Sequence, residues 1–188
     1  MINIRNLTAT LCLTIAVLLG SVGVSASADY QKGVNAYKSG DYATALRQFQ
    51  PLAELGNVRA QTMLASMYEE GKGVPQNNKT AVKWYRLAAK QGNAAAQLNL
   101  GVRYHIGEGV KKNDINAYMW WSKAADQGHK KAKKFLSVIA KKMTPSQLKK
   151  AKAGIMGGEA VFIMNQEEES ADEAEERAIQ AELDAGGC

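Results

Sequence analysis

The chain has 188 residues, of which 46% are hydrophobic and 22% charged, and a formal net charge of +6. This composition excludes a wholly disordered chain and a bundle of membrane spans, and the length predicts one modest domain. Two histidines and two cysteines offer little from which to build a metal site or a catalytic cluster. We therefore expect no cofactor, no metal and no enzymatic activity.

Residues 1–28 predict a secretory signal peptide that is cleaved before Asp29. Arg5 is its one charge, an apolar run covers residues 7–24, and small residues stand three and one before the cut. The alternative is an uncleaved anchor, because the apolar run is nearly long enough to span a bilayer. Cleavage leaves Cys188 as the single cysteine of the mature chain, so no internal disulfide can form. We expect a secreted or periplasmic protein whose mature chain has no membrane span.

Residues 29–56 predict an atypical first helical hairpin. Ala45, Phe49 and Leu52 have the spacing of a buried helix face and are in register with the hairpins that follow. The turn between its two helices is shorter than in those hairpins. An end unit of this kind covers the apolar face that a stacked array would otherwise expose.

Residues 57–92 and 93–128 are two copies of one 36-residue unit. A period of this size is typical of an array in which each unit buries its apolar face against its neighbours. The repeated structural positions are Leu64, Tyr68, Gly71, Gly73, Trp84 and Gly92 in the first copy, and Leu100, Tyr104, Gly107, Gly109, Trp120 and Gly128 in the second.

Each copy predicts two antiparallel helices joined by a glycine loop. In the first copy, Asn57 caps the first helix, and Gly71 ends it in a left-handed conformation that glycine adopts at little cost. Gly73 lets the chain turn tightly before an apolar plug, and Asn78 caps the second helix. The second copy has the same arrangement, with Asp114 as the second cap.

The second helices carry two aromatic pairs, Trp84-Tyr85 and Trp120-Trp121. Trp84 and Trp120 are in register with a stripe of small inner residues, which favours core packing over a stacking platform for bases or sugars. Tyr85 and Trp121 are less constrained, and we expect them to be partly exposed between repeats. His105 takes an exposed position of the repeat, and we expect a surface residue there.

Residues 129–156 predict two capping helices. His129 stands at the cap position of the repeat, and Thr144-Pro145-Ser146-Gln147 predicts the start of the last helix, with a cap, a proline at the first position and a glutamine three residues after the cap. Lysines concentrate here, so the alternatives are a solvated surface or a docking site for an acidic partner or an anionic envelope polymer. The export signal disfavours nucleic acid.

Residues 157–188 predict an acidic tail that is disordered or weakly helical. Their net charge is −9, against +14 for residues 29–156. A short apolar run over residues 160–164 could dock on the last helix. One hypothesis is that the tail folds back on the basic end and competes with an acidic partner; a tail that only aids solubility is the alternative.

The repeated residues resemble the Sel1-like repeat, a relative of the tetratricopeptide repeat. The first copy departs slightly, with Ala65 for the usual glycine and Asn78 for the usual aspartate, and the hairpin over 29–56 looks more like a tetratricopeptide unit. The matching residues of the second copy are Ala96, Leu100, Gly101, Tyr104, Gly107, Gly109, Val110, Asp114, Ala117, Trp120, Ala124, Ala125 and Gly128.

This resemblance implies a right-handed α-solenoid that binds a peptide or protein partner on a concave face lined by the first helices. The candidate contacts are exposed positions on those helices: Arg59, Thr62, Asn99 and Arg103. A structural component or regulator of envelope polysaccharide or cell-wall assembly is one alternative. A β-lactam hydrolase is another, disfavoured because the relatives linked to that activity have a disulfide in each repeat.

Overall fold

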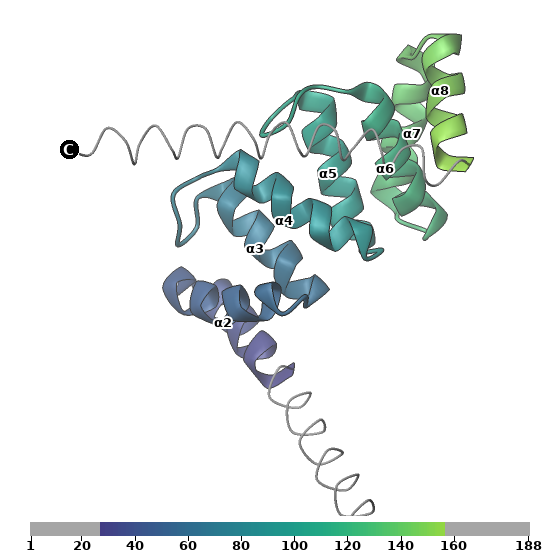
Figure 1. The fold of residues 1–188 in the computed structure, drawn as a ribbon. Coiled ribbons are helices and arrows are strands. Elements are labelled where there is room, and N and C mark those ends of the chain that lie inside the picture. The colour runs from purple at the N-terminus through teal and green to yellow at the C-terminus, as the bar shows by residue number, and fades with distance from the viewer. Residues whose placement is uncertain (1–26, 157–188) are drawn as a thin grey trace, which may run out of the picture.

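The computed structural model describes residues 27–156, which form helices joined by short connections (Figure 1). No strand occurs among these residues, and none of their helices is long and apolar enough to cross a bilayer. The predicted tail, and all but the last two residues of the predicted signal peptide, lie outside the described residues. After a helix over residues 27–39, the elements are α2 (Tyr42–Glu54), α3 (Val58–Glu70), α4 (Asn78–Lys90), α5 (Ala94–Ile106), α6 (Asp114–Asp126), α7 (Lys130–Lys142) and α8 (Pro145–Met156).

The helices stack as an all-α solenoid, which confirms the predicted fold class. α3 pairs with α4 and α5 pairs with α6, as the two repeats predict. Neighbouring units are joined where α2 packs on α3, α4 on α5, and α6 on α7. Figure 1 shows this order as a steady progression from the purple N-terminal helices to the green α7 and α8. Each helix therefore contacts elements that are close to it in sequence, as a repeat array requires.

The first helix of each unit begins and ends where local sequence predicts. Asn57, Asn93 and His129 each accept a hydrogen bond from the backbone N–H three residues on, at 3.0, 2.9 and 3.4 Å. Gly71 and Gly107 end α3 and α5 with φ of +66° and +82°. Side-chain caps and left-handed glycines satisfy backbone groups that helix ends leave unpaired, so these boundaries are local properties of the chain.

The predicted caps of the second helices are wrong by one residue. Asn77 and Asn113, not Asn78 and Asp114, have the extended backbone of a cap, with φ of −148° and −153°. The Asn77 side chain accepts from the backbone N–H of Thr80 at 3.0 Å. Each loop ends in two adjacent residues that can cap a helix, Asn77-Asn78 and Asn113-Asp114. The first residue of each pair is the cap, and the second is the first residue of the helix.

The second loop glycine has a role beyond the predicted tight turn. Gly73 and Gly109 have φ of +73° and +71°, as a tight turn needs. In addition, a Cβ at Gly109 would lie 2.2 Å from the carbonyl oxygen of Asn78, and one at Gly73 would lie 2.8 Å from that of Tyr42. Asn78 and Tyr42 are the first residues of α4 and α2. Each loop therefore presses on the start of the second helix of the preceding unit.

The expected exposure of Tyr85 and Trp121 is wrong, because the two side chains are only 1% and 3% exposed. Trp120 is also buried, whereas Trp84 is only partly buried between the two core clusters. The second helix of an interior unit packs on its own partner and on the first helix of the next unit. Two adjacent faces of that helix are thus covered, and both members of an aromatic pair can be buried.

Buried glutamines connect successive units. Gln97 is 4% exposed, and its Nε2 donates to the carbonyl oxygen of Ala89 at 3.1 Å. Gln127 Nε2 donates to Gln97 Oε1 at 2.8 Å. Gln61 and Gln91 make the corresponding bonds one repeat earlier, at the same distances. The first helix of one unit thereby adds a second hydrogen bond to a carbonyl near the end of the preceding helix, which also accepts from a backbone N–H.

We expect Gln97→Ala to lower the free energy of unfolding by about 1–3 kcal/mol, because a buried amide and both of its hydrogen bonds, to the Ala89 carbonyl and from Gln127, are removed. Urea unfolding followed by circular dichroism measures this loss. Gln127→Ala is the control, because Gln127 is exposed and its removal leaves the bond from Gln97 to Ala89 in place. An equal loss in both variants would contradict a special role for the buried amide.

The N-terminal pair has the short turn predicted for it, since only Gly40 and Asp41 separate helix 27–39 from α2. The Asp41 side chain caps α2 by accepting from the Thr44 N–H at 3.0 Å. Phe49 is fully buried, and a Cβ at Gly33 would lie 2.6 Å from its ring. This close contact holds the two helices together without the glycine loop of the later units.

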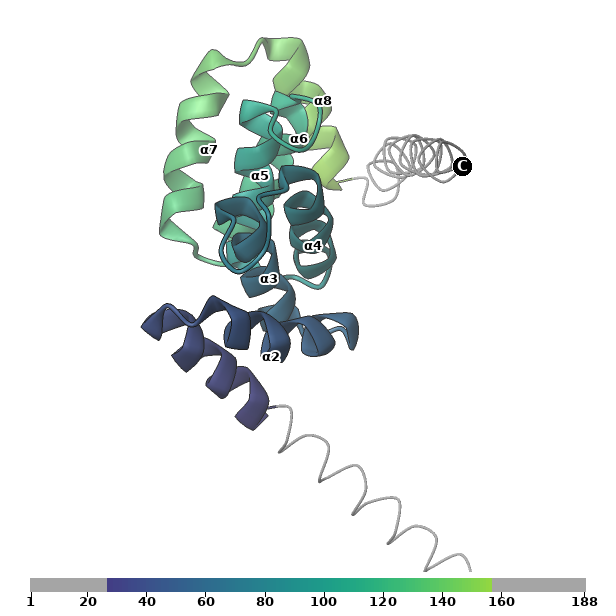
Figure 2. The same cartoon turned by 90° about the vertical axis from the view of Figure 1, so that its left-hand side faces the viewer.

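The C-terminal pair departs from the hairpin geometry, because α7 and α8 both pack on α6. Figure 2 shows them spread on either side of α6. The predicted capping box is confirmed: the Thr144 N–H donates to Gln147 Oε1 at 2.9 Å, and the Gln147 N–H donates to Thr144 Oγ1 at 3.3 Å. Ala151 on α8 is fully buried, so α8 covers the last repeat and closes this end of the array.

Candidate functional site

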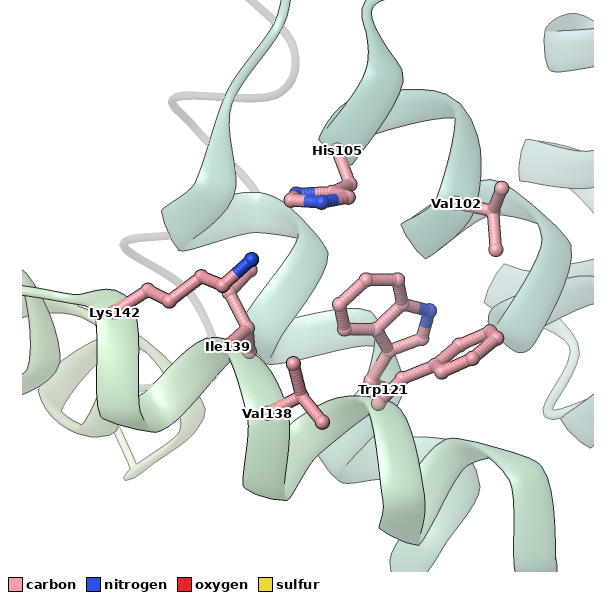
Figure 3. Close-up of a pocket in the computed structure, with 7 residues that line it drawn as sticks. Val102, His105, Trp121, Val138, Ile139 and Lys142 are labelled. Atoms are coloured by element: carbon pink, nitrogen blue, oxygen red, sulfur yellow. The ribbon is translucent and has the colours of Figure 1, made fainter.

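A pocket of about 320 Å³ opens between α5 and α7, with a side chain of α6 between them (Figure 3). The two helices are the first helices of successive units, so the pocket lies on the first-helix face of the solenoid. We call it the α5–α7 pocket. Its lining residues are Val102 and His105 from α5, Trp121 from α6, and Phe135, Val138, Ile139 and Lys142 from α7.

Trp121 forms the fixed wall of this pocket. Its indole Nε1 donates to the backbone carbonyl of Leu98 at 3.0 Å, so the polar end of the ring has a partner. Its ring centroid lies 5.2 Å from that of Phe135 and 5.6 Å from that of His105. The indole is therefore held by three neighbours and presents a rigid apolar surface to the pocket.

Gly101 makes room for this indole. A Cβ at Gly101 would lie 2.5 Å from Trp121 Nε1, well inside contact distance. One repeat earlier, Ala65 stands at the position of Gly101, and the smaller Tyr85 stands at the position of Trp121. The larger ring of Trp121 therefore occurs with glycine, and the smaller ring of Tyr85 occurs with alanine. The smaller ring leaves room for the methyl group of Ala65, which explains why this repeat can depart from the Sel1-like glycine.

His105 lies at the rim of the pocket rather than on a plain surface. Its side chain is 38% exposed, and its Nδ1 lies 2.7 Å from Asp114 Oδ1. Asp114, which the sequence suggested as a cap, instead orients this imidazole against Trp121. Within residues 27–156, no group of three or more His, Cys, Asp or Glu side chains is placed to hold a metal ion.

Two exposed apolar side chains line the pocket, and a third lies at the end of α5. Phe135 and Val138 on α7 are 39% and 53% exposed, and Ile106 at the end of α5 is 45% exposed. Phe135 and Val138 correspond in the repeat to Asn99 and Val102. This patch was not predicted from the sequence, although the 36-residue register was enough to place Phe135 and Val138 on one face of α7.

A polar network crosses the neighbouring unit and is not part of the pocket lining. The Tyr85 hydroxyl donates to Glu69 Oε2 at 2.7 Å, and Glu69 Oε1 lies 3.0 Å from Arg103 Nη2. Arg103 also pairs with Glu108. Burial, strengthened by the hydrogen bond to Glu69, raises the pKa of the Tyr85 phenol far above its ordinary value. The phenol therefore stays protonated and serves as a structural donor.

The four predicted contact residues are not gathered at this site, and none of them lines the pocket. Arg59 is exposed, with its guanidinium 4.4 Å from the Tyr30 ring centroid, and Thr62 and Asn99 are half-buried. The Arg103 side chain is only 12% exposed, so its expected exposure is wrong. Its pairing with two carboxylates explains this burial. The part of these residues in partner binding stays a prediction.

A family model described as Sel1 repeat matches residues 58–93 and 94–129. Residues 58–129 are two Sel1 repeats. The matched units begin one residue after the predicted ones. The α5–α7 pocket therefore lies where the second Sel1 repeat, which contributes α5 and α6, meets the capping helix α7.

Solved structures that are similar to this chain include the following two. A Sel1 repeat protein from Oxalobacter formigenes is 36% identical with a TM-score of 0.57, over 58% of this chain and 45% of that protein. The protein c5321, described as a protective antigen present in uropathogenic Escherichia coli strains displaying an SLR fold, is 38% identical with a TM-score of 0.53. That match covers 59% of this chain and 25% of c5321, so this chain spans less than half of either protein. No curated protein matches the chain.

Proposed function

We propose that this protein is a non-enzymatic interaction module of the cell envelope that holds a peptide or protein partner at the α5–α7 pocket. Sel1 repeats commonly act as protein–protein interaction modules. The observation that carries the proposal is the pair of exposed apolar side chains, Phe135 and Val138, beside the buried indole of Trp121. Exposed apolar patches around a pocket are typical of binding sites.

The size and the rigidity of the pocket support a peptide side chain as its occupant. Sites for small ligands usually have volumes of about 300–1,000 Å³, and this pocket lies at the lower end of that range. Aromatic walls held in one orientation lose little conformational entropy when a ligand binds. Arg59, Thr62 and Asn99, on the first helices α3 and α5, would extend the contact toward the N-terminal end.

The proposed location rests on residues 1–28, whose single charge, apolar run and small residues before Asp29 support export to the periplasm or beyond. An exported partner, or an exported region of a membrane protein, is then the molecule that this module would meet.

Site-specific photo-cross-linking tests this proposal. We expect a benzophenone amino acid in place of Val138 to give a defined cross-linked partner in the native envelope, because Val138 is 53% exposed at the pocket. Phe135→Ser should reduce the yield of that adduct about tenfold, since it removes an apolar anchor.

The control places the same benzophenone at Leu87 of α4, which is 43% exposed and lies outside the pocket. Equal adducts at both positions, or none at Val138, would contradict the proposed site. Turnover of a β-lactam by the purified chain would contradict its non-enzymatic character.

A further inference from the structure

We infer that the segment bound at the α5–α7 pocket is an acidic peptide that carries a bulky apolar side chain. This inference rests on the proposed function and assigns the chemistry of the partner. It follows from the apolar pocket together with the charge that surrounds it on α7.

The last pair of helices carries positive charge only. Residues 129–156 contain nine lysines and no aspartate or glutamate, and every one of these lysines is exposed. Such a one-sided charge distribution attracts anionic ligands and speeds their encounter. The distribution alone does not distinguish a peptide from other anions, so the positions of the lysines matter.

Three of these lysines flank the apolar patch that Phe135 and Val138 form at the pocket. Lys142 lines the pocket itself. Lys131 precedes Phe135 by four residues, and Lys134 precedes Val138 by four, so each lies one helical turn away on the same side of α7. The apolar side chains are thus bordered by ammonium groups along the helix.

The acidic residue in the α5–α6 loop and the one at the start of α6 already have partners. Glu108 pairs with Arg103, and Asp114 lies 2.7 Å from His105 Nδ1. The positions of α5 that correspond to this face, Ala95, Asn99, Val102 and Ile106, carry no charge. Lysines therefore dominate the electrostatics around the pocket, and a ligand with carboxylates next to its apolar side chain fits best.

The form of the pocket favours a peptide over a flat or purely polar anion. Trp121 is 3% exposed and lies between α5 and α7 (Figure 3). A ligand must therefore enter the pocket to contact the indole, which a single side chain can do and a flat bilayer surface cannot. A polymer with anionic groups alone would leave Phe135 and Val138 in water, without gain from apolar burial. The apolar patch and the lysines are used together only by a ligand with both kinds of group.

The test measures binding of a fluorescent synthetic peptide, with one phenylalanine between glutamate pairs, to the purified full chain by anisotropy. We expect saturable binding that weakens about tenfold from low to physiological salt, because the lysine contacts are screened. The double variant Lys134→Glu with Lys142→Glu should weaken binding about tenfold, and so should Phe135→Ser.

The matched control is the double variant Lys149→Glu with Lys150→Glu, which makes the same charge change on α8, away from the pocket. We expect it to change affinity less than about twofold. Equal losses in both double variants would overturn the inference, since net charge rather than the pocket would then govern binding. Equal binding of a peptide with serine in place of the phenylalanine would overturn it too.

Two further results separate this inference from the proposed function. If the benzophenone at Val138 captures a partner while the acidic peptide fails to bind, the inference fails and the interaction site stands. If anionic phospholipid vesicles bind the chain with the same dependence on Phe135 while the peptide does not, the surface is a lipid site and the inference is wrong.

Discussion

Gly109→Ala is expected to lower the free energy of unfolding by about 3–5 kcal/mol, the largest loss among the glycine-to-alanine changes in the two repeats. Two costs add at this position. The φ of +71° lies in the region that alanine adopts only under strain, and the new Cβ would lie 2.2 Å from the Asn78 carbonyl oxygen. That neighbour is backbone at the start of α4, so it cannot move aside like a flexible side chain.

Gly128→Ala separates the two costs. Gly128 has φ of +86°, yet a Cβ there would meet no atom within 4 Å. We expect this control to lose only about 1–2 kcal/mol, from backbone strain alone. Urea unfolding of both variants gives the difference. Equal losses would show that the loop does not press on the preceding unit.

Gly101→Ala is the second large effect, and its sign is opposite to that expected from helix propensity. Alanine in place of glycine inside a helix normally stabilises by about 0.5–1 kcal/mol. Here the new Cβ would lie 2.5 Å from Trp121 Nε1, so we expect a net loss of about 2–3 kcal/mol from overpacking. The same change should weaken peptide binding, because the displaced indole is a wall of the α5–α7 pocket.

The preceding repeat supplies the matched rescue. Trp121→Tyr in the Gly101→Ala background recreates the pair that Ala65 and Tyr85 form there. We expect the double variant to be more stable than the sum of the two single losses predicts, by about 1–2 kcal/mol in a double-mutant cycle. Additive losses would mean that Gly101 and Trp121 do not constrain each other.

The predictions that succeeded concern features decided within a few residues. Asn57 and Asn93 cap helices, and Gly71 and Gly107 end them, because a cap bond and a left-handed glycine involve only the neighbouring backbone. The capping box of Thr144 and Gln147 is equally local. The second caps were predicted one residue too late, because each of those loops has two adjacent residues able to cap.

The predictions of exposure that failed depend on what packs against a residue from outside its own helix. Tyr85 and Trp121 were expected to be partly exposed because they lie outside the repeated core stripe of their own helix, whereas the next unit covers them. Arg103 looked exposed because its carboxylate partners, Glu69 and Glu108, lie outside its own helix. Only the packed structure brings these groups together.

By itself, the sequence determined the array: a 36-residue period with small residues, glycines and one tryptophan at constant positions leaves a stack of helical pairs as the way to bury the apolar faces. Only the tertiary structure decided the site. Its walls come from α5, α6 and α7, and it exists because α7 packs on α6 beside α5 and leaves Phe135 and Val138 uncovered. A repeat period describes what each unit shares with the next, whereas a pocket depends on the side chains in which adjacent units differ.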